Sequence, residues 1–336
     1  MKRLHRLWKD YTDYGKITQI NMRDGIYKLP QEFLFKLKNI YPSNFTRVAT
    51  TFLTKKNTTF RINYLKTDLR TLRKLLVNQR VKCNELTFPK GAFLLKTSLR
   101  EFQKTEIYKN GLVFVQNLSS MLPVLCLSPE NNDRILDLCA APGAKTTQIS
   151  SLAPKAEVIA IEKDRPRYYK LLANLKTQGI ESTRVILLDS IWVRKKFPEY
   201  FDKILADVPC SSEGRFLTTN PKSFKYWKQR KVKEMMHKQK KLLHSAFLAL
   251  NEGGTLVYST CTFSPEENEG VIDWFINKFK EKVEILPIDI PLKNAKEGLS
   301  QWGDKKYSSS LRLTRRIIPD EIMEGFFVAK IKKISV

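Results

Sequence analysis

From residue 134 onward, short apolar runs alternate with longer segments in which apolar positions recur at helical spacing. The strand-like runs are 134–138, 158–161, 185–188, 203–208 and 255–259, and two later runs, 284–288 and 326–331, bring their number to seven. The helical segments are 145–152, 167–177, 222–250 and 266–279. Strands and helices that alternate in this way are typical of parallel βαβ units. The pattern therefore predicts an α/β fold with a doubly wound, seven-stranded sheet.

The N-terminal third has a different pattern. Residues 33–40 have the spacing of an amphipathic helix, 60–64 read as a short strand, and 67–76 read as a second helix with leucines on one face. A chain of 336 residues is long enough for two domains. We predict a smaller, mixed α/β domain over residues 1–110 and a larger α/β domain over residues 111–336.

The charge of the chain is strongly unbalanced. The sequence has 60 Lys and Arg against 34 Asp and Glu, a net charge of +26. Residues 1–110 hold 24 basic and 8 acidic side chains, a net of +16, and residues 215–241 hold ten basic and one acidic, a net of +9. Either run could be a solvated face. The functional interpretation is that both face a phosphate backbone, which makes the first domain a nucleic-acid-binding one.

Several kinds of protein are not expected. The five cysteines include no C-x-x-C pair and have no histidine near them, so neither a disulfide framework nor a metal site is predicted. The basic start leads into no apolar run of about 7–15 residues, so neither a secretory signal nor a membrane span is expected. We predict a cytoplasmic protein that acts as a monomer.

The segment 136–147, Leu-Asp-Leu-Cys-Ala-Ala-Pro-Gly-Ala-Lys-Thr-Thr, follows the first strand and opens a helix. Its small residues allow backbone N–H groups to approach a ligand at the helix end. Glu162, Asp189 and Asp207 end the next three strands, and a carboxylate at such a strand end can accept both hydroxyls of a ribose. Neither a G-x-G-x-x-G motif nor a P-loop is present. The pattern predicts a nucleoside cofactor without identifying it.

Two cysteines have positions that indicate chemistry. Cys210 follows Pro209 at the end of the fourth strand, and Cys261 follows Thr260 at the end of the fifth. Both share the strand-end edge with Asp207. Cys83 and Cys126 are better explained as small buried side chains. Cys139 is interpreted as packing or as backbone of the cofactor loop. Spacing alone does not decide whether Cys210 or Cys261 is a nucleophile.

Taken together, these segments resemble the Sun (Fmu) family of RNA cytosine-5 methyltransferases. The resemblance rests on 137–146, on Asp-Val-Pro-Cys-Ser at 207–211, and on Ser-Thr-Cys-Thr at 259–262 followed by Pro-Glu-Glu-Asn-Glu at 265–269. Segments 60–63, 111–116 and 325–329 are also similar. One departure is Ala144, where the family usually has a second glycine. Alanine would be strained there at positive φ, and would fit well as a first helical residue.

The resemblance implies a Rossmann-like methyltransferase domain, an RNA partner (rRNA or tRNA) and S-adenosylmethionine as cofactor. It also implies Cys261 as nucleophile, Cys210 in product release, and Lys145 in the catalytic pocket. Asp207 would serve both as the acid near N3 of cytosine and as a contact to the methionine end of the cofactor. Glu162 would hold the ribose, and Asp189 would lie near the adenine. The remaining implied cofactor contacts are Cys139, Ala140, Ala141, Pro142, Gly143, Ala144 and Lys145.

Cytosine C5 is not nucleophilic until a thiolate adds to C6, which explains why this chemistry needs a cysteine. The target base must be unpaired or flipped. Aromatics in the basic stretch, Phe224, Tyr226 and Trp227, could stack on it, although core packing is the better explanation for most of them. Two alternatives stay open. One is a DNA cytosine-5 methyltransferase with Cys210 as nucleophile, and the other is a non-catalytic RNA-binding assembly factor.

Overall fold

The computed structural model describes residues 25–335 and divides into two compact units. The described part of the first unit is 25–55 with 216–227, and the second unit is 56–215 with 228 onward. The sequence-based boundary at residue 110 falls inside the second unit. Residues 1–24 of the predicted basic domain lie outside the described residues, and its role in RNA binding stays a prediction.

The first unit is a small helical cluster built around Phe33. Its elements are η2 (Ile26–Lys28), α3 (Gln31–Ile40), η3 (Pro42–Asn44), α4 (Phe45–Thr50) and η6 (Pro221–Ser223). The Phe33 ring contacts those of Phe52, Phe216 and Trp227 at centroid distances of 5.5, 4.9 and 6.0 Å. Trp227 is therefore a core residue, as one of the two interpretations allowed, whereas Tyr226 is exposed.

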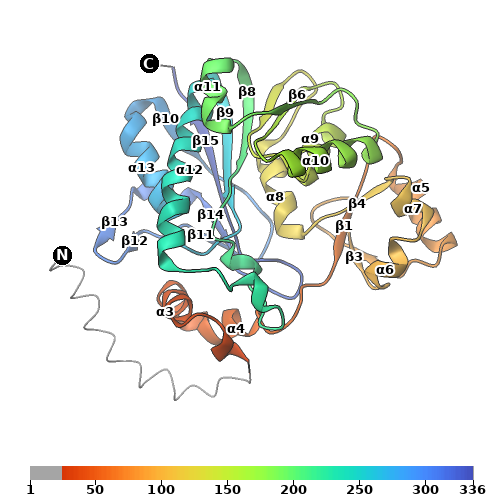
Figure 1. The fold of residues 1–336 in the computed structure, drawn as a ribbon, viewed down its shortest axis with the longest axis horizontal. Helices are drawn as coiled ribbons and strands as arrows, with labels where there is room; N and C mark the ends of the chain where they lie inside the picture. Colours follow the sequence, from red (N-terminus) through yellow and green to blue (C-terminus); the bar gives the residue numbers. More distant parts are fainter. Residues whose placement is uncertain (1–24, 336) are drawn as a thin grey trace. The chain divides into compact units, whose positions relative to one another are not determined.

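The second unit is built on a nine-stranded sheet in the order β11-β14-β15-β9-β8-β5-β6-β7, with β10 also paired to β15 (Figure 1). Strands β5 to β9 are parallel, and β15 is antiparallel to β9. The strands are β5 (Arg134–Asp137), β6 (Glu157–Glu162), β7 (Arg184–Leu187), β8 (Phe201–Asp207), β9 (Leu250–Thr260), β10 (Val283–Leu286), β11 (Ala295–Glu297), β14 (Arg315–Ile317) and β15 (Phe326–Lys333). This arrangement confirms the predicted Rossmann-like α/β class.

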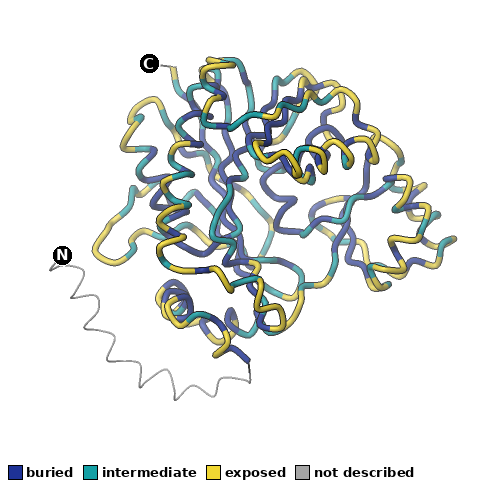
Figure 2. The backbone as a smooth tube through the Cα atoms, in the orientation of Figure 1, coloured by how far each residue is buried: buried dark blue, intermediate teal, exposed yellow. Residues whose placement is uncertain are grey.

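Helices cover both faces of this sheet, because its central strands are apolar on both sides. Ile135, Leu205 and Val257 pack against one layer of helices, and their neighbours Leu136, Ile204 and Leu256 pack against the other. The first layer comprises α8 (Leu118–Leu127), α9 (Ala144–Leu152) and α10 (Arg165–Gln178); the second comprises α11 (Val193–Lys196), α12 (Gln229–Ala249) and α13 (Glu269–Phe279). Figure 2 shows the central strands largely as buried, and exposed residues along α10 and α12.

All seven predicted strands are present, and two short antiparallel strands, β11 and β14, extend the sheet beyond them. The predicted helix 222–250 is wrong at its start, because α12 begins only at Gln229. Pro221 begins a 3-10 turn, and the residues up to Trp227 belong to the first unit. Apolar periodicity cannot distinguish such a segment from a helical turn. The remaining short elements are η4 (Ser190–Trp192), η5 (Glu213–Arg215), η7 (Lys280–Lys282), η8 (Ser309–Leu313), β12 (Gln301–Trp302) and β13 (Lys305–Lys306).

The second unit also contains a small antiparallel sheet in the order β2-β3-β1-β4. Its elements are β1 (Thr59–Ile62), α5 (Leu69–Asn78), β2 (Cys83–Glu85), β3 (Ala92–Leu95), α6 (Leu99–Phe102), α7 (Glu106–Lys109) and β4 (Val113–Val115). Arg61 of β1 is buried, and its Nη2 donates to the carbonyl oxygen of Ala144 (3.0 Å) and to Thr147 Oγ1 (2.8 Å) in α9. The small sheet therefore supports the first turn of α9 directly.

A buried ion pair joins the start of α13 to β14. Arg316 Nε donates to Glu269 Oε1 at 2.6 Å, its Nη2 donates to Oε2, and its Nη1 donates to the carbonyl oxygen of Phe263 at 2.9 Å. Both side chains are at most 2% exposed. Glu269 Oε1 also accepts from the backbone of Leu299. Removing one partner would leave the other charge buried and uncompensated.

We therefore expect Glu269→Gln to lower the free energy of unfolding by about 3–5 kcal/mol. Glutamine has the shape of glutamate and keeps an oxygen that can accept from the Leu299 N–H. The decrease in the free energy of unfolding therefore measures the effect of removing the negative charge. Arg316→Met should cost a similar amount. The double variant should lose less free energy of unfolding than the two single variants lose together, because no buried charge remains in it. Urea unfolding of all four proteins measures this, and strictly additive losses would contradict the interpretation.

Candidate active site

A cavity of about 430 Å³ lies at the carboxyl ends of β5, β8 and β9. Parallel strands bring their carboxyl ends to one edge, which is where doubly wound sheets bind ligands. Most of the predicted site residues line it: Cys139, Ala140, Ala141, Pro142, Ala144, Lys145, Asp207, Cys210 and Cys261. Gly143, Glu162 and Asp189 do not themselves line it. The structure thus places the turn at 139–145 and both thiols at one cavity.

The turn between β5 and α9 has the geometry of a ligand-approaching loop. Gly143 precedes α9 with φ of 104°, a conformation that favours glycine, and a Cβ there would lie 2.8 Å from Leu171 Cδ1. Ala144 is the first residue of α9. The departure from the family pattern therefore falls where alanine is unstrained, and the positive-φ alternative is wrong.

Glu162 ends β6 behind the turn and is buried. Its Oε1 accepts hydrogen bonds from the backbone N–H groups of Lys163 and Asp164, both at 2.9 Å. Its Oε2 lies 3.2 Å from Arg167 Nη1 but, among residues 25–335, receives no hydrogen bond. Arg167 lines the cavity and is half exposed. Glu162 Oε2 therefore contacts the cavity only through Arg167, and it has no hydrogen bond of its own within the described residues.

Asp189 caps η4, with Oδ1 accepting from the Ile191 N–H at 3.2 Å. Its Oδ2 lies 3.4 Å from Lys163 Nζ. Asp137, at the end of β5, accepts from Thr146 Oγ1 at 2.7 Å, and burial raises its pKa to about 6. Asp137 and Glu162 thus end β5 and β6, and Asp189 follows β7; of these three carboxyl groups only Asp137 lines the cavity.

Asp207 and Lys145 form an ion pair inside the cavity. Lys145 Nζ lies 2.6 Å from Asp207 Oδ2 and 2.8 Å from Ser120 Oγ, and Ser259 Oγ donates to Asp207 Oδ1 at 2.7 Å. Lys145 is only 11% exposed, so solvent screens the pair weakly. The lysine comes from the cofactor turn and the aspartate from the strand that leads to Cys210. The pair therefore joins the two predicted halves of the site.

The sulfur atoms of Cys210 and Cys261 are 3.3 Å apart. A hydrogen bond from Cys210 lowers the pKa of Cys261 to about 7, against the effect of burial, and the positive charge of Arg215 acts in the same direction. The same hydrogen bond, together with burial, raises the pKa of Cys210 well above the ordinary thiol value. These opposite shifts correspond to a Cys210 thiol that donates to a Cys261 thiolate. The surroundings of the two thiols therefore differ, because the positive charge of Arg215 acts on Cys261 whereas the nearby carboxyl group of Glu267 acts on Cys210.

Two buried glutamates hold the loops that carry the thiols. Glu213 accepts from Thr262 Oγ1 (2.9 Å), the Phe263 N–H (3.1 Å) and Ser264 Oγ (2.6 Å), just beyond Cys261. Glu267 Oε2 accepts from the Ser211 N–H, next to Cys210, at 2.9 Å and from Gln239 Nε2 at 2.8 Å. Burial raises the pKa of Glu267 to about 8.

Sequence reasoning missed three side chains of the site: Ser259 and Ser120, which bond to Asp207 and Lys145, and Arg215, which lines the cavity. Ser259 belongs to the Ser-Thr-Cys-Thr segment and precedes the nucleophile candidate by two residues, so its position could have been noted. Arg215 opens the basic stretch but was counted only as charge. Ser120 lies in α8, and no motif marks it. Position along a strand predicts which residues reach the edge, but it does not predict a partner from a separate helix.

The parallel sheet, the small-residue turn and the carboxylates behind it define a Rossmann-like methyltransferase. The sequence profile described as 16S rRNA methyltransferase RsmB/F matches residues 124–332, and the chain belongs to this family. The resemblance inferred from the motifs is therefore confirmed, and so is the enzyme class, an RNA cytosine-5 methyltransferase dependent on S-adenosylmethionine.

Individual relatives agree with this assignment. A tRNA (cytosine(49)-C(5))-methyltransferase from Pyrococcus abyssi is 37% identical over 81% of this chain and 87% of its own length. A mouse 28S rRNA (cytosine-C(5))-methyltransferase is 33% identical over 99% of this chain but 41% of its own length. The crystal structure of a methyltransferase homologue from Pyrococcus horikoshii, 28% identical, superposes with a TM-score of 0.82 and covers 94% of this chain and all of the homologue.

No helix among residues 25–335 is both long and apolar enough to span a membrane. In the same part of the chain, no group of three or more His, Cys, Asp or Glu side chains is placed to hold a metal ion.

The thiol geometry predicts how Cys261 reacts with iodoacetamide as pH changes. Its alkylation rate should rise with a midpoint near its pKa of about 7, because the thiolate is the nucleophile. Cys210→Ala removes the largest cause of the lowered pKa and Arg215→Gln removes a further one, so each should move the midpoint up by about one pH unit or more. Mass spectrometry of the Cys261 peptide measures this. The matched control is Arg312→Gln, an exposed arginine that does not line the cavity; an unmoved midpoint in both test variants would contradict the assignment.

Proposed function

We propose that this chain methylates carbon 5 of a cytosine in structured RNA, with Cys261 as the nucleophile and S-adenosylmethionine as the methyl donor. One observation carries the proposal. A thiol with lowered pKa, a second thiol 3.3 Å from it and a lysine–aspartate pair line the same cavity, next to the cofactor turn. Each step of cytosine methylation has a side chain in this set.

The residues present fit the cofactor. Glu162 Oε2 is a buried carboxylate oxygen that receives no hydrogen bond among residues 25–335, and a ribose hydroxyl could donate to it once Arg167, 3.2 Å away, moves or shares it. We assign the turn from Cys139 to Lys145 to the cofactor, with Asp189 near the adenine and Asp207 near the methionine end. When bound, the cofactor supplies an electrophilic methyl group. The chain must hold the base so that C5 faces that group.

The first step assigned to the chain is attack by Cys261. The Sγ–C6 bond forms, the C5–C6 double bond opens, and the electron pair makes C5 nucleophilic. The hydrogen bond from Cys210 and the charge of Arg215 lower the pKa of Cys261 to about 7, so that a large fraction of it is the thiolate near neutral pH before attack. The ring must accept electron density as the bond forms, and a hydrogen bond to N3 makes this possible.

We assign that hydrogen bond to Asp207 together with Lys145. Lys145 Nζ lies 2.6 Å from Asp207 Oδ2, so a proton can pass from the ammonium to the carboxylate as the carboxylic acid donates to N3. Ser259 and Ser120 hold the two groups in place through hydrogen bonds of 2.7 and 2.8 Å. The pair thus stores a proton at the position where the ring needs one.

Release requires that the C5 proton leaves and that the Sγ–C6 bond breaks. We assign this step to Cys210. The largest cause of its raised pKa is the hydrogen bond to Cys261, and that cause disappears once the Cys261 sulfur is bonded to C6. The loss of that cause lowers the pKa of Cys210 toward the ordinary thiol value. The Cys210 thiol then gives its proton to solvent, and its thiolate takes the proton from C5. The C5–C6 double bond re-forms, the Cys261 sulfur leaves as a thiolate, and N3 returns its proton to the Asp207–Lys145 pair. Attack by one thiol therefore activates the other.

The substrate class follows from the family and from the charge. The +26 net charge favours a polyanion, and the relatives act on transfer or ribosomal RNA. Residues 1–110, with a net of +16, are proposed to bind the RNA backbone. We propose the cytoplasm as the compartment because all five cysteines are free and the two adjacent thiols must stay reduced. We further propose that the enzyme acts as a monomer.

The two thiols can be separated by single substitutions. Cys261→Ala should abolish methyl transfer and form no covalent complex, because no thiol attacks C6. Cys210→Ala should still attack but stall before release, so a denaturant-resistant protein–RNA adduct should accumulate when S-adenosylmethionine and total transfer and ribosomal RNA are supplied. Denaturing gels measure both.

Cys83→Ala, on β2, is the matched control and should behave as the unmodified chain does. The double variant Cys210→Ala/Cys261→Ala should lose the adduct again. An adduct with Cys261→Ala and none with Cys210→Ala would reverse the roles and favour the DNA-methyltransferase arrangement. Methyl transfer by Cys261→Ala at the normal rate would overturn covalent catalysis by this residue.

Cofactor binding can be tested at Glu162. Glu162→Gln keeps the Oε1 acceptor for the two backbone N–H groups, whereas alanine would leave them unsatisfied. Loss of the carboxylate charge should weaken S-adenosylmethionine binding roughly tenfold, because it removes a charge-assisted hydrogen bond to the ribose. Calorimetry measures the affinity. Glu157→Gln, exposed at the start of the same strand, is the control; equal affinity of the two variants would refute the ribose assignment.

A further inference from the structure

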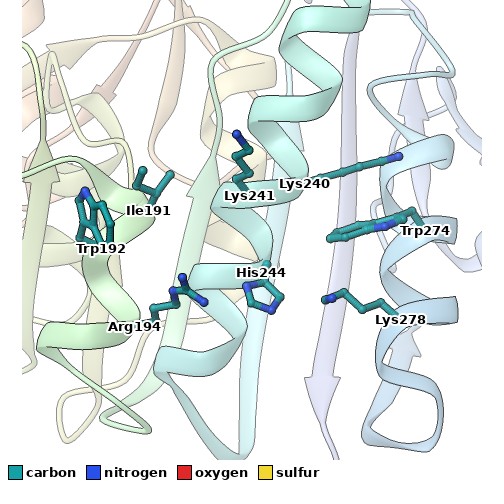
Figure 3. Close-up of a pocket in the computed structure, with 8 residues that line it drawn as sticks. All are labelled: Ile191, Trp192, Arg194, Lys240, Lys241, His244, Trp274 and Lys278. Atoms are coloured by element: carbon teal, nitrogen blue, oxygen red, sulfur yellow. The ribbon is translucent and has the colours of Figure 1, made fainter.

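A second pocket, of about 330 Å³, shares no lining residue with the catalytic cavity. It lies on the outer helical layer of the second unit. Figure 3 shows Trp192 entering from η4, Lys240, Lys241 and His244 from α12, and Trp274 from α13. The remaining cations are Arg194 and Lys278.

The walls of this pocket are fixed by contacts between the elements that carry it. Ser245 of α12 donates to the carbonyl oxygen of Ile191 at 2.9 Å, and its Oγ accepts from the Arg194 N–H at 3.3 Å. The rings of Phe247 in α12 and Phe279 in α13 are 4.2 Å apart. The pocket is therefore a built feature of the layer and does not depend on a mobile loop.

Its charge is entirely positive. Four of the eight lining residues, Arg194, Lys240, Lys241 and Lys278, are basic and none is acidic. Within residues 25–335 none of these four is in an ion pair, and the nearby Asp273 carboxylate pairs instead with Lys305 at 2.8 Å. Four cations gathered without carboxylates repel one another and favour an anionic ligand.

The pocket also offers flat aromatic surfaces. Trp192 is 45% exposed, so a large aromatic face is open to a ligand, and Lys195 Nζ lies 4.7 Å from its centroid. Lys240 and Lys278 lie 5.4 and 5.7 Å from the ring of Trp274. An acidic peptide would use the cations but not the rings. Aromatic platforms combined with cations are what unpaired nucleotides bind, through stacked bases and contacted phosphates.

Position connects this pocket to the proposed RNA site. Gln239 faces inward and donates to the carbonyl oxygen of Pro209 at 3.0 Å, one residue before Cys210. Lys240 and Lys241 follow it directly and turn to the pocket. Lys238, one turn before Lys241, faces Lys163 and Asp189 at the carboxyl edge of the sheet. Cations on α12 thus run from the strand ends to the pocket.

We propose that this pocket binds an unpaired nucleotide of the RNA substrate outside the catalytic cavity, with its base stacked on Trp192 and its phosphates held by Arg194, Lys241 and Lys278. The inference rests on the proposed function, since it takes RNA as the substrate. It adds a second contact that would help to select RNAs in which a single-stranded segment lies at a fixed distance from the target cytosine.

The test uses the full chain and a fluorescent ten-nucleotide oligouridylate, together with an abasic strand of the same length. Trp192→Ala should weaken binding of the oligouridylate about fivefold or more but leave the abasic strand unaffected, because stacking of one base is worth at least about 1 kcal/mol. Trp192→Phe keeps a ring and should restore most of the affinity. Lys241→Gln/Lys278→Gln should weaken both strands and reduce the salt slope by about 1.4, as expected for two phosphates.

Lys296→Gln/Lys306→Gln, two exposed lysines that do not line the pocket, is the matched control for charge. If anisotropy titrations with the oligouridylate give equal affinities for Trp192→Ala and the unmodified chain, the proposal that this pocket binds a nucleotide is overturned. Tight binding of oligoglutamate in competition with the oligouridylate would overturn it as well, since that result would indicate an acidic peptide as the ligand. Methyl transfer is measured separately: an unmodified chain that binds the strands through this pocket but methylates no RNA would refute the proposed function without moving the binding result.

Discussion

The 3.3 Å contact between Cys210 and Cys261 is the interaction on which the site depends. The two sulfurs lie on different loops, and each loop is fixed by a glutamate that is fully buried. Glu213 reaches across from the Cys210 side to bind three groups just beyond Cys261, and Glu267 reaches back from beyond Cys261 to the backbone next to Cys210. The hydrogen bonds of Glu213 thus link the Cys210 loop to the Cys261 loop, and those of Glu267 link the Cys261 loop to the Cys210 loop. The separation of the sulfurs is therefore constrained from both sides.

Buried carboxyl groups are expensive unless they are hydrogen-bonded, which explains why this region is rich in short polar side chains. Burial also raises the pKa of Glu267 to about 8, so this group is largely protonated at neutral pH. A neutral Glu267 adds little negative charge beside Cys210. The positive charge of Arg215 acts from the Cys261 side. Cys210 and Cys261 are chemically identical thiols, so the difference between their pKa values comes from the groups that surround each of them.

Much of the fold and of the site could be predicted from the sequence, because the spacing of apolar residues and the positions of strand ends are local properties of the chain. The seven strands, the turn at Gly143 and the edge shared by Asp207, Cys210 and Cys261 followed from them. Ser120 and Arg215 did not, because each reaches the site from an element whose pattern shows only packing or charge. Gln229 as the start of α12 was also missed, since the residues before it belong to another unit. Contacts between elements distant in sequence are what a single sequence does not reveal.

The position of β15 within the sheet has a consequence for how the chain becomes active during synthesis. This strand follows every other strand of the sheet in chain order, yet it pairs with β9 along one side and with β10 and β14 along the other. Phe326, its first residue, lines the catalytic cavity. The sheet cannot close over its apolar residues until β15 is inserted, and such sequence-distant pairing is a slow step in folding. A chain that ends before β15 therefore contains both cysteines but lacks one wall of the cavity around them.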